Sequence, residues 1–303
     1  MPTYNNISRH TSNVILDPEI SAEIWGAAIG QSAFMQLANR ITIPGNGVKI
    51  QTITGEPSAG WVDETNAKPV SFHTFGNKTI TPYKLAVIEP FSDEFRRDKA
   101  ALYAECVRRL PGAIAKKFDS TIMGSSAPGT GFDVLGTGVS KVGIGGSNVY
   151  GTFVGIDGTI AAANGVMDSI ALAPQGKSLV LAAVDQVGRP LFTPGVESNT
   201  VGNILGANVA IAKGVYASGS PNIVGVAGDF SGVRWGMVEN IKIAISDQAT
   251  LSYNDGSDHT LNLWQMNMFA VKVECEVTFA VMDKNQLVLL TDADATTTTT
   301  TGA

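Results

Sequence analysis

A phosphate-binding loop is the first chemistry that the residue types of this chain suggest. Gly176, Lys177 and Ser178 stand in the order that ends a P-loop. In that motif glycine backbone N–H groups cradle the phosphates and the lysine reaches the β- and γ-phosphates. The motif also needs a glycine five residues before Gly176, and the sequence has Ala171 there. The motif is incomplete, so we expect no nucleotide site at this position.

Other residues that could carry catalysis are scattered along the chain. The stretch "GIGGSN" has Asn148 where a dinucleotide-binding fingerprint needs its third glycine, and no HExxH, GxSxG or paired-cysteine motif occurs. Asp93 and Glu94 are more typical of solvated residues at the start of a helix than of a catalytic pair. The histidines lie far apart in the chain: His10, His73 and His259. The sequence therefore predicts a protein that is not an enzyme and has no cofactor or metal site.

Composition restricts the class of protein further. Charged residues make up 16% of the 303 positions, against about 25% in typical domains. Gly occurs 33 times. Such a chain is either a β-rich protein with many turns or a subunit whose surface is covered by copies of itself, and composition does not separate these readings. The net charge of −6, without a block of Lys and Arg, gives no sign of a nucleic-acid reader.

Hydrophobic periodicity predicts an order of elements that mixes helices and strands. Residues 1–14 are polar and irregular, and the last residues are a Thr-rich tail that we expect to be disordered. Pro111 interrupts the second helix, where we expect a kink or a break. The long final strand should bury one face and leave the other face exposed to solvent. The predicted helices cover 17–43, 98–124 and 159–172, and the predicted strands cover 48–54, 78–88, 177–185, 222–231, 241–246 and 271–281.

The loop between the first two strands holds an aromatic residue in an unusual place. Gly and Pro punctuate the stretch Ser58–Phe72, which leaves it no regular element of its own, yet Trp61 stands in its middle. A lone two-stranded hairpin is marginal in water, so this one must lie on its own domain or on another chain. Trp61 either folds back on its own hairpin or is buried by a neighbour.

By the last strand, the order of elements resembles that of the major capsid proteins of tailed bacteriophages with the HK97 fold. The resemblance covers about residues 17–291, and its motifs are diffuse although their order is specific. "GWVDETNAKP" is similar to the middle of the family's extended loop, and "TPYKLAVIEPFSDEFRRD" is similar to the returning strand and the start of its long spine helix. "GRPLF" and "GDFS" stand where the axial domain of the family has them.

The resemblance implies an α+β protein with an HK97-like fold built from peripheral and axial domains, a spine helix and an extended loop. We expect the intersubunit contacts of that loop to include Trp61, Val62, Glu64, Lys68 and Phe72. The expected parts are 1–43 for the arm and first helix, 44–90 for the extended hairpin, 91–149 for the spine helix and first peripheral part, 150–235 for the axial domain, and 236–303 for the second peripheral part and tail.

The resemblance also implies the function and the partners. Copies would form the hexamers and pentamers of an icosahedral phage head that encloses packaged DNA without sequence-specific binding. A portal would occupy one vertex, and a scaffolding protein and decoration proteins are further expected partners. Because few residues precede the first helix, we expect any scaffolding segment to be missing or encoded separately. The protein would be found in the virion, and in the host cytoplasm during assembly.

Two alternatives and one chemical question stay open at this point. An encapsulin-like bacterial nanocompartment would share the fold, and a β-rich binding or adhesin module would be a monomer or small oligomer. Part of the family joins its subunits by Lys–Asn isopeptide bonds. Lys68 and Lys78 lie near the loop and Asn267 and Asn285 near the final strand, but nothing in their spacing shows that a pair meets, and we expect no crosslink.

Overall fold

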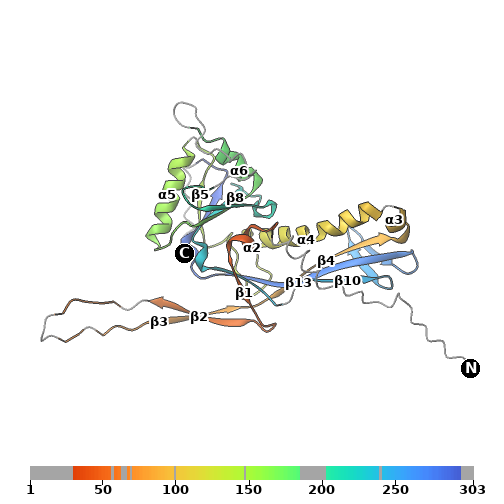
Figure 1. Ribbon diagram of the computed structural model, residues 1–303, viewed down its shortest axis with the longest axis horizontal. Coiled ribbons are helices and arrows are strands. Elements are labelled where there is room, and N and C mark those ends of the chain that lie inside the picture. The colour runs from red at the N-terminus through yellow and green to blue at the C-terminus, as the bar shows by residue number, and fades with distance from the viewer. Residues whose placement is uncertain are drawn as a thin grey trace, which may run out of the picture.

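The computed structural model describes residues 30–55, 58–62, 67–68, 70–98, 100–146, 148–184, 203–238 and 241–294. The predicted arm, residues 17–29 of the predicted first helix and the Thr-rich tail lie outside these residues. In the described part of that predicted helix, Ala33–Leu37 is helical, but Asn39–Thr42 is a strand, so the prediction is wrong there. The described chain forms two lobes and a hairpin that extends away from both (Figure 1). No helix within the described ranges is long and apolar enough to cross a membrane.

The first lobe is a five-stranded sheet covered by a long helix. The central strand β13 is paired on its two sides, and α4 runs over the sheet (Figure 1). The elements of this lobe are α2 (Ala33–Leu37), β1 (Asn39–Thr42), β4 (Tyr83–Ser92), α3 (Asp93–Asp98), α4 (Ala100–Met123), β9 (Val233–Met237), β10 (Lys242–Ser246) and β13 (Met268–Val281). A two-stranded hairpin of β11 (Thr250–Asn254) and β12 (Asp258–Asn262) joins β10 to β13.

The second lobe is another five-stranded sheet, in the order β5-β14-β8-β6-β7. Its helices α5 and α6 supply buried apolar side chains to a core of their own. The elements are β5 (Ser140–Gly143), α5 (Val149–Ala162), β6 (Ser169–Leu172), α6 (Pro174–Leu181), β7 (Asn208–Ile211), β8 (Ile223–Gly228) and β14 (Leu287–Thr291), with short 3₁₀ turns η1 (Lys213–Val215), η2 (Phe230–Gly232) and η3 (Lys284–Gln286).

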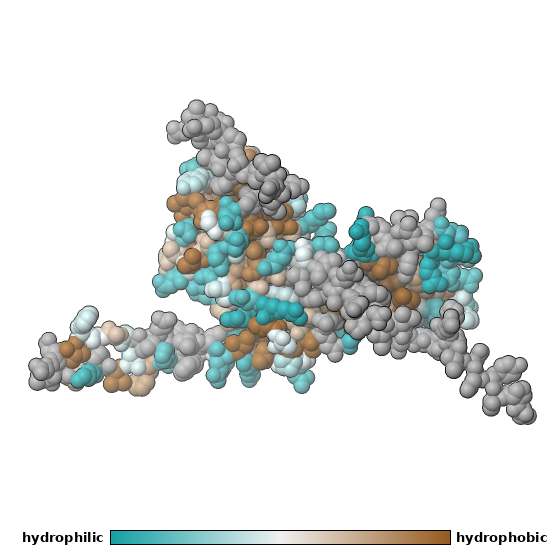
Figure 2. Space-filling view, viewed as in Figure 1, coloured by the Kyte–Doolittle hydropathy of each residue, from teal (hydrophilic) through white to brown (hydrophobic). Residues whose placement is uncertain are grey.

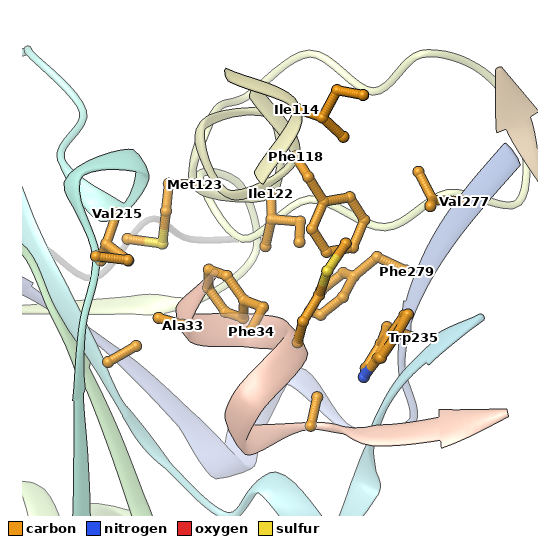
Figure 3. Packing of buried hydrophobic residues seen from close by; sticks show 14 of the residues in the cluster. Ala33, Phe34, Ile114, Phe118, Ile122, Met123, Val215, Trp235, Val277 and Phe279 are labelled. Atoms are coloured by element: carbon orange, nitrogen blue, oxygen red, sulfur yellow. The ribbon is translucent and has the colours of Figure 1, made fainter. Parts of the chain in front are cut away.

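A cluster of aromatic residues fills the space between α2, α4 and the first sheet. Phe34 of α2 packs edge-to-face on Phe279 of β13, with ring centroids 5.4 Å apart. Phe118 of α4 meets the same Phe279 at 6.4 Å, and Trp235 of β9 is buried beside them (Figure 3). These side chains come from positions spread over most of the chain, so the core forms only when distant segments meet.

Several predicted elements are confirmed. β13 buries Val271, Val273 and Cys275 and leaves Lys272 and Glu274 partly exposed, as alternation predicts. From residue 277 to 281 both faces are buried, Thr278 included, so the expected solvent-exposed face is wrong for that end of the strand. The predicted strand 241–246 is β10, and the predicted second helix is α4. Pro111 lies inside α4, which is continuous from Ala100 to Met123, so the helix is not broken there.

Three predictions about the second lobe are wrong. The helix expected over 159–172 begins earlier, at α5, and 169–172 is a strand whose four residues are all buried. The segment expected as a strand over 177–185 contains the end of α6, because Pro174 starts a helix at its first position. β13 is also not the last strand, since β14 follows it.

The sheets divide the chain at other points than the expected boundaries. β14 pairs with β5 and β8 in the second lobe, although 236–303 was expected to be peripheral. β5 lies in the expected peripheral range 91–149. β9 pairs with β13 in the first lobe although it begins inside the expected axial range 150–235.

Candidate functional site

The projecting hairpin consists of β2 (Val48–Gly55) and β3 (Thr74–Ile80), which pair antiparallel from Val48 opposite Ile80 outwards. The two strands form a separate two-stranded sheet that joins neither of the larger sheets. A returning strand was predicted as one piece over 78–88. The structure instead splits it at residues 81–82 into β3 and β4, so the hairpin and the first lobe are linked at that break.

An apolar cluster holds the base of the hairpin on the first lobe. Ile43, Ile80 and Ala280 are each about 99% buried or more, and Val48 and Ile50 of β2 pack against them. Because Ala280 belongs to β13, the base of the hairpin packs on the central strand of the first sheet. Burial of this kind stabilises by about 25 cal/mol per Å² of apolar surface, so the base is held more firmly than a free hairpin would be.

An ion pair reinforces this base. The Lys78 ammonium lies 2.5 Å from Asp133 Oδ2 and also donates a hydrogen bond to the carbonyl oxygen of Val281. The same Asp133 oxygen accepts a hydrogen bond from the Val281 N–H at 2.7 Å. β3, the loop after α4 and the end of β13 are therefore tied together at one point.

The loop after α4 sets the direction in which the chain leaves the hairpin. Thr81 N–H donates to the Gly131 carbonyl at 3.2 Å, and Tyr83 Oη donates to the Thr130 carbonyl at 2.8 Å. Gly131 has φ +85°, and a Cβ there would lie 2.8 Å from Thr81 Oγ1, so a side chain would displace the junction. The Gly-rich stretch after 124 thus acts as a brace for the link between β3 and β4.

The far end of the hairpin carries exposed apolar side chains. Trp61 is fully exposed and Phe72 is 80% exposed. The arm at the left of Figure 2 carries patches of brown, hydrophobic atoms. Val62 and Lys68 are exposed as well. Trp61 does not fold back on its own hairpin, so that alternative is wrong for the single chain. Glu64 lies outside the described residues.

Sequence reasoning missed two exposed apolar features. Val70 is 78% exposed between Lys68 and Phe72, and only its position in the predicted loop could have pointed to it. A second group lies at the end of the β11–β12 hairpin and the turn before β13: Tyr253, Trp264 and Met266, all more than half exposed. Trp264 and Met266 lie between two predicted strands, in a segment without hydrophobic periodicity. Nothing in the sequence therefore indicated that their side chains are exposed.

A buried carboxyl group fixes the start of α2 on the spine helix. Asp119 of α4 accepts hydrogen bonds from Ser32 Oγ at 2.6 Å and from the Ala33 N–H at 3.0 Å. Ser32 Oγ in turn accepts from the Met35 N–H and caps α2. Burial raises the pKa of Asp119 to about 7, although its hydrogen bonds oppose the shift. Within the described ranges, no group of three or more His, Cys, Asp and Glu could hold a metal ion.

Two lobes that share a long helix, together with a projecting two-stranded arm, define the class of the HK97-like capsid fold. A chain in a structure of Mycobacterium phage Ogopogo has a TM-score of 0.70 at 20% identity and covers 87% of this chain and 92% of that one. The capsid chain of a native GTA particle has a TM-score of 0.61 at 16% identity, covering 88% and 90%. At these identities the likeness concerns the fold alone.

Sequence comparison then gives the family. The profile described as Phage capsid family matches residues 12–292. The probable major capsid protein gp17 of Mycobacterium phage L5 is 32% identical over 301 residues, covering 93% of this chain and 90% of that protein. The major capsid protein of Staphylococcus phage 80alpha is 25% identical over 292 residues, covering 94% and 87%. The chain belongs to the phage capsid family.

The function follows from this membership. The protein is a structural major capsid protein that assembles with copies of itself into the shell of the phage head, and its place is the virion. It is not an enzyme. Neither alternative is supported, because the matching relatives are phage capsid proteins rather than compartment or adhesion proteins.

Proposed function

We propose that the β2–β3 hairpin reaches over a neighbouring subunit and holds the shell together, with Trp61 as an anchor. The observation that carries this is the contrast between its two ends. The base is clamped by buried Ile43 and Ile80, whereas Trp61 and Phe72 at the far end are exposed in the single chain. An arm that is held at its base and carries apolar side chains near its far end is suited to deliver them to another surface.

The size of the effect follows from the area involved. A Trp buries roughly 150–250 Å² when it packs fully, which at about 25 cal/mol per Å² is about 4–6 kcal/mol before ordering costs. Anchor residues in interfaces commonly contribute about 2 kcal/mol or more after those costs. A shell repeats each contact many times, so a modest contribution per subunit suffices to favour closure.

We further propose that hexamers and pentamers of the chain close into an icosahedral head around DNA. The first lobe would be the peripheral domain and the second lobe the axial domain, with the axial part made of β5 to β8 together with β14. A second apolar core that lies wholly within the second lobe supports this division, although the larger core also takes in residues of β6, β7, β8 and β14. The portal, a scaffolding protein and decoration proteins remain expected partners, and the DNA would be enclosed without sequence-specific contacts.

We also keep the expectation that no Lys–Asn crosslink forms. Lys78 supports it, because its ammonium is engaged by Asp133 and by the Val281 carbonyl at the base of the hairpin. Particles boiled in detergent should run as one band near the 31.7 kDa monomer. A ladder of covalent oligomers would contradict this expectation.

The test of the anchor is Trp61→Ala, with Trp61→Phe as the matched control. Because Trp61 makes no intrachain core contact, the alanine variant should keep the circular dichroism spectrum and solubility of the wild-type subunit. Sedimentation and negative-stain microscopy should show far fewer particles, and Phe should restore part of the assembly. If the alanine variant unfolds, or forms particles as stable as those of the wild type, Trp61 is not an anchor.

A further inference from the structure

A basic groove of about 930 Å³ runs between α4 and η1. One wall is the face of α4 that carries Arg108, Arg109 and Lys116, and the other wall carries Lys213 of η1. The groove ends at Gln31, just before α2. The two walls are in direct contact at the base, because a Cβ on Gly214 of η1 would lie 2.7 Å from the Lys116 carbonyl oxygen of α4.

Positive charge is concentrated in this groove. Four of its eleven lining residues are Lys or Arg, against 21 of 303 in the whole chain, and none of the eleven is Asp or Glu. Between 107 and 123 the exposed charged side chains of α4 are all positive, and the one carboxyl group there, Asp119, is buried. A chain of net charge −6 thus holds a local surface that attracts anions.

Two of these cations are available to a ligand. Within the described part of the chain, Lys116 and Lys213 form no ion pair, whereas Arg108 and Arg109 have other interactions as well. Lys116 and Lys213 stand on opposite walls, so an anion in the groove would meet positive charge from both sides.

The lining favours a phosphate backbone over an acidic protein segment. Arg108 and Lys116 are eight residues apart on one helix, which is about 12 Å along its axis, a length over which duplex DNA presents several phosphates. Peptide segments usually need apolar anchor pockets, and here the large apolar lining residue is Ile211 alone. The groove has no aromatic lining residue on which an unpaired base could stack, so single strands are less suited than a duplex.

We propose that the basic groove binds the phosphate backbone of duplex DNA enclosed by the shell, without reading its sequence. The proposal rests on the proposed function, since it requires that the α4 face with the groove is turned to the interior. Each subunit offers only a few cations, so a single contact is weak and sensitive to salt. Repeated over many subunits, such contacts would order the outermost DNA while the overall negative charge keeps the rest from adhering.

The test measures duplex binding and assembly separately, on the full-length chain. A fluorescent mixed-sequence duplex of about 20 base pairs is titrated with unassembled subunits, and anisotropy is recorded at several salt concentrations. The variant Lys116→Gln/Lys213→Gln removes two groove cations. Its control, Lys84→Gln/Lys272→Gln, removes two cations that pair with Glu276 and Glu274 elsewhere on the first sheet.

The groove variant should bind the duplex about ten-fold or more weakly at 0.1 M salt, and its slope of log K against log salt should be smaller by about 1.8. The control should match the wild type in both quantities. The proposal is overturned if the groove variant binds like the control, if the wild type binds no duplex, or if a polyglutamate peptide competes for the groove better than the duplex does. Particle formation is compared independently between the wild type and Trp61→Ala under the same assembly conditions, and an equal yield would count against the proposed function instead.

Discussion

Replacing Asp119 should show how strongly the spine helix holds the start of α2. Asp119→Ala removes the acceptor of Ser32 Oγ and of the Ala33 N–H, and both donors are buried. A buried donor that loses its partner costs about 1–3 kcal/mol, so the two together should lower the free energy of unfolding by about 2–6 kcal/mol. Asp119→Asn keeps one acceptor oxygen and should lose less.

The same residue should make stability depend on pH. Burial raises the pKa of Asp119 from 3.8 to about 7 in the folded chain. Between these values the folded state binds more protons than the unfolded state, so stability falls as pH rises. The contribution is complete below about pH 4 and is lost as pH passes 7. At about 1.4 kcal/mol per pH unit, the whole change is on the order of 4 kcal/mol.

Urea unfolding of unassembled subunits at pH 5, 6, 7 and 8 measures this effect. The difference in unfolding free energy between the wild type and Asp119→Asn should shrink or reverse as pH rises, because the amide does not titrate. The exposed Asp157→Asn variant is the control and should run parallel to the wild type. If the Asp119→Asn curve is also parallel to the wild type, burial of Asp119 has no energetic consequence and the reasoning fails.

Three further predictions concern packing. Gly143→Ala should lower the free energy of unfolding, measured by thermal denaturation, by about 2 kcal/mol or more, because the new Cβ would lie 2.3 Å from the Ala293 carbonyl oxygen. Gly158→Ala in α5, where a Cβ meets nothing within 4 Å, should instead raise it by about 0.5–1 kcal/mol. Thr278→Val should leave stability unchanged or raise it by about 1 kcal/mol, because the buried hydroxyl has no hydrogen-bond partner among the described residues; a clear loss would reveal one. Asp133→Ala should speed amide hydrogen exchange in β2 and β3 but not in α4, and equal exchange in both would show that the ion pair with Lys78 does not brace the hairpin.

The spacing of apolar residues in the sequence was enough to predict the helices and strands that have one apolar and one polar face. Alternation from Val271 to Val281 predicted β13, and three- and four-residue spacing predicted α4, because each pattern records which side of an element meets the core. The absence of a complete catalytic or metal motif likewise needed no structure. The punctuated stretch around Trp61 identified the segment whose apolar side chains the single chain leaves exposed.

Contacts between distant segments were decided only by the tertiary structure. Residues 174–181 are rich in apolar side chains that suit a buried strand or a buried helix equally, and packing of α6 against the second sheet selects the helix. β14 follows β13 closely, yet it pairs with β5 and β8 in the other lobe. Ser32 and Asp119 are 87 positions apart, and the basic groove joins residues from α4 and η1. Periodicity along the chain carries no information on which distant segment a side chain will meet, because that choice depends on the free energy of the whole packed arrangement.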